Sequence, residues 1–404
     1  MLTAALGQEG LLSTRQLDEH GVTNHARATM LRRGHLVRLT RGVYDAAALL
    51  RAGGWPAAGP EDLDAARRRT AWTGLLGFGP SAIAVGPSAL ALLDVQGLPR
   101  SVPAQVALPG GRHARSRDGL RVRCFDQGMA LWQCRGRLVA APAWALAQAV
   151  CELDRRHAVA VLDSALHLGL VADVEEVRRL SVGRRGAART RSWWDLVDGR
   201  ADSPLETDAR LQCLDAGIEP DDLQVIVRDD AGRVLARGDL GWRLPRGRWL
   251  VAEIDGRGPH SQPDALYGDR SRQNAIVATG RVDVLRFTAR DLARDQLAPT
   301  VRAVLSRPAD APHGPVPDGP SPRTRGSGRS GQSDPAQPPG RQPKSAQPPG
   351  RQPESAQPPG RQPKSAQPPG RQPESAQPPG RQPESAQPPG HHAEPVEDPS
   401  LSGA

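Results

Sequence analysis

The chain has 404 residues, with 53 Lys plus Arg, 44 Asp plus Glu, 40 Pro and 43 Gly but only 3% aromatic residues. This length allows two or three domains. The four cysteines form no Cys-x-x-Cys pair, which argues against a zinc site or a disulfide framework and favours reduced thiols in a cytoplasmic protein. The apolar stretch 70–93 is interrupted by Gly and Pro, whereas a spanning helix needs about 20 continuous apolar residues, so we expect no membrane segment.

The last 98 residues, 307–404, are predicted to form a disordered repeat tail. They hold 26 of the 40 Pro and no aromatic, Met or Cys residue, which leaves too little apolar surface to offset the entropy of ordering a chain. A decapeptide, Ala-Gln-Pro-Pro-Gly-Arg-Gln-Pro-(Lys/Glu)-Ser, repeats five times from Ala336 to Ser385. Such an array is either a polyproline ligand or a solvated spacer, and its composition favours the spacer.

The remaining part, 1–306, predicts an α+β multidomain protein. It keeps 42 basic against 35 acidic residues, so its charge suits a polyanionic partner. Residues 1–50 show two helical patterns and a hairpin. Residues 60–200 are rich in Ala and Leu and predict a mostly helical middle domain with a few strands, and 201–306 mix helices with strand-like runs. Gly, Pro and Asp residues interrupt the apolar pattern at 53–59 and 198–202, which marks the boundaries.

Residues 13–44 predict a small DNA-binding unit. Ser13 or Thr14 caps a helix that runs to His20, and Thr23 caps a second helix over 24–33. Two short strands follow, over 36–39 and 42–44, which completes the order of a winged helix-turn-helix. In such a unit the second helix enters the major groove and the wing lies against phosphates. The residues expected to contact nucleic acid are Asn24, His25, Arg27, Arg32 and Arg33 on the helix and Arg38 and Arg41 on the wing.

The alternative is that these arginines only form a charged, solvent-exposed helix face with no ligand. Basic residues on both helix and wing, with no acidic residue between His20 and Tyr44, favour DNA binding. The stretch from Arg32 to Arg38, followed by Arg-Gly-Val-Tyr at 41–44, resembles the N-terminal winged-helix domain of AbiEi-type antitoxins from type IV toxin–antitoxin systems. The resemblance covers about 45 residues. It implies DNA binding and autorepression; a cognate toxin would be a partner, although this domain alone identifies none.

The C-terminal segment predicts the element order α-β-β-β-α-β-α. Helices are expected over 204–216, 268–279 and 289–305, and strands over 223–228, 234–242, 249–255 and 282–287. Because strand side chains alternate, Glu253 and Asp255 share one face of the third strand. A turn centred near Arg246 would place Asp239 directly opposite Glu253. Two like charges about 5 Å apart at Cβ cost stability unless a cation lies between them.

Asp239, Glu253 and the carbonyl of Ile254 would form an oxygen-only site suited to Mg²⁺ or Mn²⁺. Such a metal lowers the pKa of a bound water and stabilises charge on a phosphoryl oxygen, as phosphodiester hydrolysis requires. In the alternative interpretation Asp239 pairs with Arg237 or Arg248, and Glu253 pairs with a neighbouring arginine, as ordinary surface ion pairs. The residues alone favour neither interpretation.

Five motifs stand in order along this segment: Ser203–Glu206, Arg237–Trp242, Val251–Gly256 with His260, Asp269–Arg272 and Val284–Thr288. Over about 100 residues they resemble the PD-(D/E)XK nuclease-like domain related to very-short-patch-repair (Vsr) endonucleases, which has a restriction-endonuclease-like αβββαβ fold. The resemblance implies metal ligands at Asp239 and Glu253 and a helix carboxylate at Glu206. It also implies phosphate or proton-transfer groups at His260, Arg270 and Arg272.

One position departs from that superfamily, because Asp255 stands where its lysine is expected. No Lys precedes Lys344, so a lysine-dependent mechanism is excluded and Arg272 or His260 would have to take that role. Two further residues have structural explanations. Glu206 follows Ser203 by three positions and so fits a capping box, a metal site or both. His260 lies in a predicted loop, where a solvated histidine is the simpler interpretation.

These patterns predict a cytoplasmic DNA-binding protein with a metal-dependent endonuclease domain, in phage defence, a toxin–antitoxin system or DNA repair. The alternative is a non-enzymatic, antitoxin-like repressor whose nuclease-like domain only binds nucleic acid. The basic run at 178–191 precedes Trp193 and Trp194. For this run a solvated helix end beside core tryptophans is favoured over a nucleic-acid contact.

Overall fold

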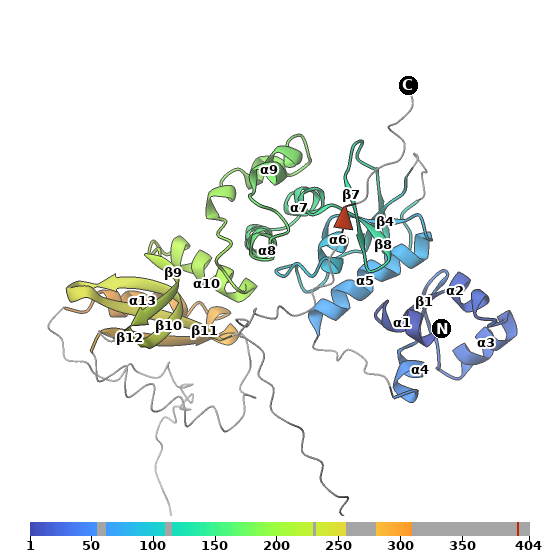
Figure 1. Cartoon of the computed structure of the whole chain (residues 1–404), viewed down its shortest axis with the longest axis horizontal. Coiled ribbons are helices and arrows are strands. Elements are labelled where there is room, and N and C mark those ends of the chain that lie inside the picture. The colour runs from blue at the N-terminus through green and yellow to red at the C-terminus, as the bar shows by residue number, and fades with distance from the viewer. Residues whose placement is uncertain (55–61, 110–114, 229–231, 256–279, 309–393, 396–404) are drawn as a thin grey trace, which may run out of the picture. The chain divides into compact units, whose positions relative to one another are not determined.

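The computed structural model describes residues 1–54, 62–109, 115–228, 232–255, 280–308 and 394–395. Over these residues the chain is α+β, with helices packed around three sheets (Figure 1). Among them no helix combines the length and the apolar character that crossing a bilayer requires. The α+β fold class is therefore confirmed.

Residues 1–52 form four helices and a small antiparallel sheet. The helices are α1 (Leu2–Leu6), α2 (Thr14–Glu19), α3 (Asn24–Arg32) and α4 (Ala47–Ala52), and the strands are β1 (Leu11–Ser13), β2 (Val37–Thr40) and β3 (Val43–Asp45) in the spatial order β1-β3-β2. Helix α2 begins at a capping box between Ser13 and Gln16, and α3 begins where Thr23 accepts a hydrogen bond from the Ala26 amide. Both predicted helices and the hairpin are present; α1, β1 and α4 are additional.

This N-terminal module is attached to the first helix of the next segment, α5 (Leu63–Phe78), by ion pairs. Arg68 Nε lies 2.5 Å from Glu9 Oε1, and Arg69 Nη2 lies 2.5 Å from Asp45 Oδ2. Arg69 also donates to the Glu9 carbonyl at 2.7 Å. The four side chains are each less than one-third exposed. These contacts therefore fix α5 against both β3 and the turn before β1.

The middle segment has far more residues in helices than in strands, in agreement with the prediction of mostly helix with a few strands. Besides α5 it contains α6 (Pro87–Leu92), α7 (Pro142–Val150), α8 (Arg155–His167), α9 (Glu175–Ser181) and two short 3-10 turns, η1 (Ala187–Thr190) and η2 (Trp194–Leu196). It also contains the strands β4 (Ile83–Ala84), β5 (Gln105–Ala107), β6 (Arg121–Arg123), β7 (Leu131–Cys134) and β8 (Arg137–Ala140). These strands have two to four residues each, too few for an alternating pattern to stand out in the sequence.

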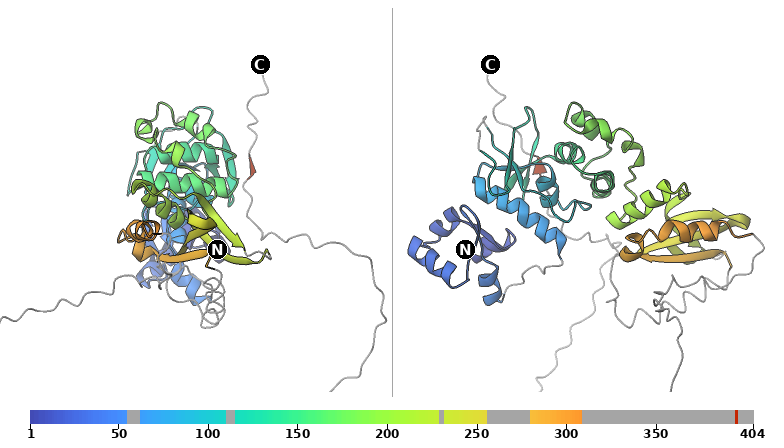
Figure 2. Two further views of the ribbon diagram at one scale, coloured as in Figure 1. Left: turned by 90° about the vertical axis from the view of Figure 1, so that its left-hand side faces the viewer. Right: turned by 180° about the vertical axis from the view of Figure 1, so that it is seen from behind.

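The sheet of this segment has the order β13-β7-β8-β4-β5-β6. Helix α5 lies against β4 and β5 (Figure 2). Helix α7 is buried on nearly every side, because its Ala-rich sequence lets the neighbouring helices approach closely. Trp194 is only 7% exposed, as expected for a core tryptophan.

The outermost strand of that sheet comes from the predicted tail. Strand β13 (Glu394–Pro395) pairs antiparallel with β7, with Glu394 opposite Gln133 and Pro395 opposite Trp132. Disorder throughout 307–404 is therefore wrong for these two residues. The decapeptide repeats lie outside the described residues.

In its described residues, the C-terminal segment forms a four-stranded sheet with three helices. They are α10 (Pro204–Asp215), β9 (Asp222–Arg228), β10 (Val234–Leu244), the 3-10 turn η3 (Pro245–Gly247), β11 (Arg248–Asp255), β12 (Val282–Thr288), α12 (Ala289–Leu292) and α13 (Leu297–Leu305). The strand order is β12-β11-β10-β9, with β11 and β12 parallel and the other pairs antiparallel. The predicted last helix is two helices, separated where Asp295 has a positive φ of 53°. The helix expected over 268–279 lies outside the described residues.

Candidate nucleic-acid interface and carboxylate site

The β10–β11 hairpin brings two of the predicted site residues together. Its ladder runs from Leu244 opposite Arg248 to Leu240 opposite Ala252, and Asp239 and Glu253 are the next residues on the two strands. The chain reverses through η3, where Arg246 has a φ of 64°. This is the register and the turn that the sequence predicts. The Asp239 carboxylate also accepts a hydrogen bond of 2.6 Å from the amide of Ile254.

Glu206 reaches this region from the first turn of α10. Its Oε1 accepts a hydrogen bond from Ser203 Oγ at 2.8 Å, and its Oε2 accepts one from the Asp202 amide at 2.9 Å. Ser203 Oγ in turn accepts from the Glu206 amide. Glu206 is only 7% exposed. Ser203 therefore caps the helix, but the reciprocal half of the predicted capping box is not formed, because Glu206 accepts from the Asp202 amide and not from that of Ser203. The Glu206 side chain also stays within electrostatic reach of Asp239.

The carboxyls of Glu206 and Asp239 are both harder to ionise than usual, chiefly because of burial. Burial raises the pKa of Glu206 above its ordinary value, and the charges of Asp239 and Asp202 raise it further. Burial likewise raises the pKa of Asp239, with the Ile254 amide opposing the shift and Glu253 adding to it. Like charges gathered in this way are unfavourable unless a proton or a cation lies among them.

Glu253 follows the ion-pair interpretation instead. Its Oε2 lies 2.8 Å from Arg286 Nε, because the parallel pairing of β11 with β12 sets these two residues side by side. The arginines proposed for Asp239 have other partners. Arg248 lies 2.6 Å from Asp283, and Arg237 lies 3.6 Å from Asp202. The surface ion-pair interpretation is thus right for Glu253, whereas Asp239 forms neither of the predicted ion pairs, with Arg237 or with Arg248.

The donor chemistry of this carboxylate site suits a hard cation, since carboxylate oxygens are preferred by Mg²⁺ and Mn²⁺. Asp239 and Glu253 would be the ligands, and Glu253 would have to exchange Arg286 for the metal. In the part of the chain that the structure describes, no three His, Cys, Asp or Glu side chains converge as a ligand set. Asp255 is exposed at the end of β11, opposite Thr288. His260, Arg270 and Arg272 lie outside the described residues.

Gln224 is a residue of this site that the sequence did not single out. Its side-chain Nε2 donates to Glu206 Oε2 at 2.8 Å, and its side-chain Oε1 accepts from Arg237 Nη2 at 3.3 Å. It lies within β9 yet has a φ of 52°, a conformation that costs a non-glycine residue energy and is held only by surrounding contacts. No sequence signal marks it, because the pairing of β9 with β10 had to be known first.

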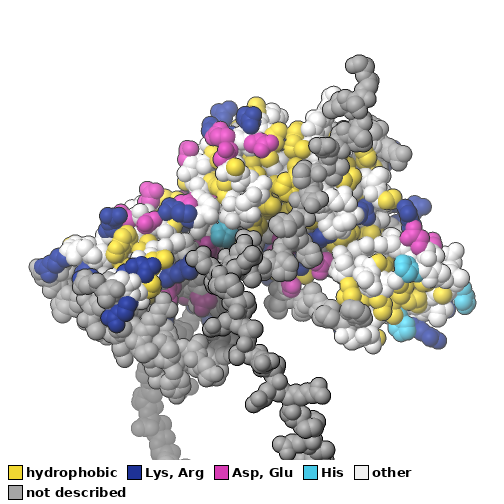
Figure 3. Space-filling model, in the orientation of Figure 1, with side chains coloured by type: hydrophobic (Ala, Val, Ile, Leu, Met, Phe, Trp, Pro, Cys, Tyr) yellow, Lys and Arg dark blue, Asp and Glu magenta, His cyan; other side chains and the backbone are white. Residues whose placement is uncertain are grey.

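The N-terminal module exposes most of its predicted nucleic-acid residues. His25, Arg32 and Arg33 are exposed on α3, and Arg38 and Arg41 are exposed on the β2–β3 hairpin. Figure 3 shows cyan and dark-blue side chains at the edge where α2 and α3 lie in Figure 1. Dark-blue side chains also recur over the four-stranded sheet. Every cation in residues 1–306 other than histidine and the amino terminus is an arginine.

Arg27 is the exception, and its assignment to the nucleic-acid face is wrong. It is 9% exposed, with its guanidinium 3.1 Å from Asp18 Oδ1 and 5.8 Å from the centre of the Tyr44 ring. Asn24, which is itself exposed, accepts a second hydrogen bond from it. Arg27 therefore packs the inner face of α3 and cannot reach a phosphate.

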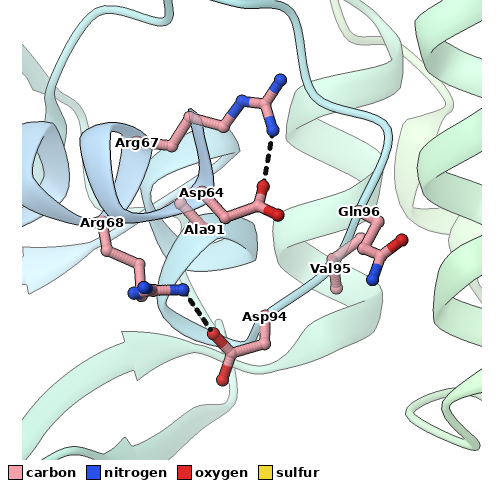
Figure 4. A pocket seen from close by; sticks show the side chains of 7 residues that line it. All are labelled: Asp64, Arg67, Arg68, Ala91, Asp94, Val95 and Gln96. Carbon is pink, nitrogen blue, oxygen red and sulfur yellow. Dashed lines mark hydrogen bonds and ion pairs between the residues drawn. The ribbon is translucent and has the colours of Figure 1, made fainter. Parts of the chain in front are cut away.

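A separate hollow lies between α5 and the segment that follows α6, and Figure 4 shows the side chains around it. Arg67 is paired with Asp64 at 2.5 Å, and Arg68 lies 3.2 Å from Asp94. Arg67 also donates to the carbonyls of Leu98 and Pro99. Because these contacts already engage both guanidinium groups, the hollow offers little charge to a ligand.

No protein-family model matches the chain. Two curated proteins of Mycobacterium tuberculosis, one from each of two strains and both described as uncharacterized, are similar to part of it. Each is 32% identical over 155 residues, which make up 38% of this chain and 56% of the relative. The chain thus spans little more than half the length of these relatives, and their printed descriptions name no activity.

Proposed function

We propose that this chain is a DNA-binding protein whose N-terminal module reads duplex DNA and whose C-terminal domain hydrolyses phosphodiester bonds with a divalent metal. The order α1-β1-α2-α3-β2-β3 supports a winged helix, in which α3 would enter the major groove and the β2–β3 hairpin would be the wing. The order α10-β9-β10-β11 followed by β12 agrees with the αβββαβ nuclease fold.

The observation that carries the DNA-binding part is the exposed basic surface of the module. Arg32 and Arg33 at the end of α3 and Arg38 and Arg41 on the wing are all exposed, and residues 21–44 contain no acidic side chain. Arginine is suited to both phosphate and guanine recognition, since its planar fork donates two hydrogen bonds at once. Such a surface attracts DNA by releasing the counterions that its phosphates hold.

The salt dependence of DNA binding tests this surface. Replacing Arg32 and Arg33 with Ala should weaken binding and reduce the slope of log affinity against log salt by about 2, because two phosphate contacts are lost. Arg51, exposed on α4, offers a matched control. Arg51→Ala should leave the slope close to that of the wild type. An unchanged slope in the double variant would contradict the assignment of α3.

The carboxylate site supports the nuclease part. Asp239 and Glu253 are adjacent across the hairpin, and the pKa of both Asp239 and Glu206 is raised in a way that a bound cation would reverse. A metal held there would supply a water of lowered pKa and stabilise charge on a phosphoryl oxygen. Asp255 at the usual lysine position leaves proton transfer to another group.

Nicking of supercoiled plasmid measures this activity directly. The wild type should nick DNA in Mg²⁺ or Mn²⁺ and not in chelator, and Asp239→Ala should lose nicking while still binding DNA. Asp222, which forms a surface ion pair with Arg200, supplies a control carboxylate on the same sheet. Asp222→Ala should nick as the wild type does. Nicking that survives Asp239→Ala would exclude this site.

A non-enzymatic regulator is the second candidate, and the Glu253–Arg286 ion pair favours it. Arg286 neutralises the charge of Glu253, so this proposed ligand needs no metal. In addition, Asp255 stands where a nuclease of this superfamily would have its lysine. In that case the protein would be an antitoxin-like repressor, with a toxin as its partner. The expected result is then DNA binding with no metal-dependent nicking under any condition tested.

A further inference from the structure

The turn at residues 117–120 of the middle segment is held rigidly against the end of α5. Arg117 and Leu120 exchange backbone hydrogen bonds of 3.0 and 2.7 Å across Asp118 and Gly119. The Arg117 guanidinium donates to the Gly77 carbonyl at 2.6 Å and lies 5.1 Å from the Phe78 ring centre. Leu120 is 4% exposed. It lies so close to Gly77 that a Cβ there would come within 2.9 Å of it.

Asp118, at the apex of this turn, is bonded to the wing of the N-terminal module. Its Oδ2 accepts a hydrogen bond of 2.6 Å from Thr40 Oγ1. This hydrogen bond, the nearby Arg41 amide and the charges of Arg117 and Arg38 hold the pKa of Asp118 below its ordinary value. Thr40 is only 6% exposed. A carboxylate thus lies inside an otherwise basic surface.

The wing is held at its far end by buried Val43 and by the hydrogen bond from the Thr14 amide to the Gly42 carbonyl, whereas β2 itself is less supported. Strand β2 is an edge strand that pairs only with β3, and its register shifts between Arg38 and Thr40. Val37 is 53% exposed and Leu39 is 43% exposed, so the side chains before Thr40 bury little surface. An edge strand of this kind relies on outside contacts to keep one conformation. Among the residues described, Asp118 supplies the side-chain contact at the end of the strand.

We propose that Asp118 is a positioning residue for DNA binding, which fixes the wing so that Arg38 and Arg41 face the phosphates. The inference rests on the proposed DNA binding of the N-terminal module and extends it. The DNA-reading unit then includes the turn at 117–120 as well as residues 1–52. A negative charge beside two phosphate-binding arginines is unfavourable in itself. A carboxylate at Asp118 therefore favours DNA binding only because its fixing of the wing outweighs its repulsion of the phosphates.

Two substitutions that remove the same charge separate positioning from repulsion. Asp118→Asn keeps an oxygen that can accept the hydrogen bond from Thr40, whereas Asp118→Ala keeps none. We expect Asp118→Asn to bind DNA at least as tightly as the wild type and Asp118→Ala to bind roughly fivefold more weakly or worse. Tighter binding by both variants would mean that Asp118 only repels DNA. Equal binding by all three proteins would equally overturn the proposal.

Hydrogen exchange at the backbone amides of the β2–β3 hairpin gives a readout that needs no DNA. It should be slow in the wild type and in Asp118→Asn and fast in Asp118→Ala. A wild type that binds no DNA would contradict the proposed function. The exchange pattern would still show whether the contact between Asp118 and Thr40 fixes the wing. Thr40→Val provides a second variant with no change of charge. It should weaken DNA binding in the same direction as Asp118→Ala, and wild-type affinity in a folded Thr40→Val protein would contradict the positioning role.

Discussion

Asp163 and Arg210 form an ion pair of 2.8 Å that is almost fully withdrawn from solvent and joins α8 to α10. Their side chains are 1% and 8% exposed. Asp163 also accepts hydrogen bonds from Thr207 Oγ1 at 2.8 Å and from the Asp198 amide at 2.7 Å. The middle segment is therefore connected to the C-terminal domain through a buried polar network in which each member depends on the others.

Breaking this pair should be costly. Arg210→Met should lower the free energy of unfolding at pH 7 by about 3–5 kcal/mol, because it leaves the Asp163 carboxylate buried without its cation. Arg200 serves as the matched control, since it pairs with Asp198 and Asp222 while remaining 56% exposed. Arg200→Met should cost less than about 1 kcal/mol. Urea unfolding of both variants measures the difference, and equal losses would contradict the account.

The same network predicts a pH dependence of stability. Burial raises the pKa of Asp163 to about 6 against the attraction of Arg210, from an ordinary value of 3.8. The folded state then binds the proton more tightly than the unfolded state. The resulting stabilisation is complete below pH 3.8 and is lost as the pH rises through about 6, a change of about 3 kcal/mol.

Comparison with Asp163→Asn isolates this contribution from those of the other carboxyls. The stability of the wild type relative to the variant should fall by about 3 kcal/mol between pH 4 and pH 7. Urea unfolding at several pH values provides the measurement. A difference that stays constant, or that grows with pH, would show that the pKa of Asp163 is not raised.

Arg27 should behave differently from the other arginines of α3. Because it is buried against Tyr44 and paired with Asp18, Arg27→Ala should destabilise the protein, by about 1–3 kcal/mol, through lost packing and hydrogen bonds. Thermal unfolding measures this loss. In folded Arg27→Ala protein the salt slope of DNA binding should equal that of the wild type, in contrast to the Arg32 and Arg33 variant. A reduced salt slope in Arg27→Ala would show that Arg27 does contact a phosphate.

A divalent cation should stabilise the C-terminal domain if the carboxylate site binds it. Mn²⁺ at millimolar concentration should raise the Tm of the wild type, because it binds only the folded form. Asp239→Asn should abolish this response and, without metal, leave the protein as stable as the wild type or slightly more so, since repulsion with Glu253 and Glu206 is relieved. Calorimetry with and without Mn²⁺ tests both points. A wild type that is indifferent to Mn²⁺ counts heavily against the nuclease proposal.

The sequence specified local features well and distant ones poorly. The Asp239–Glu253 register follows from the turn at 245–247, because a short hairpin fixes which residues oppose one another. The start of α10 follows from Ser203 and Glu206 for the same local reason. Arg286 could not be placed beside Glu253, because a parallel pair is joined by a long connection that sets no register.

Two other features could not be predicted, for physical reasons. The positions and pairing of the few strands expected in the middle segment were not predicted, because strands of two to four residues show too little alternation to be distinguished from Ala-rich helix. Arg27 was assigned to the surface because charged side chains are almost always exposed. Its burial depends on Asp18 of α2 and Tyr44 of β3, which meet it only in the fold, and on Asn24 three residues earlier on the same helix.

The use of arginine alone for the cations of residues 1–306 has a chemical consequence. The only lysines are Lys344 and Lys364, both in the decapeptide repeats. Lysine acetylation therefore cannot remove charge from the proposed DNA-binding surface, and guanidinium groups stay charged at any pH at which the protein is folded. Amine-directed reagents would react with the repeats and the amino terminus while leaving every basic side chain of 1–306 intact. A fluorophore or crosslinker attached at Lys344 or Lys364 would thus report on the repeats without altering the electrostatics of the modules that they follow.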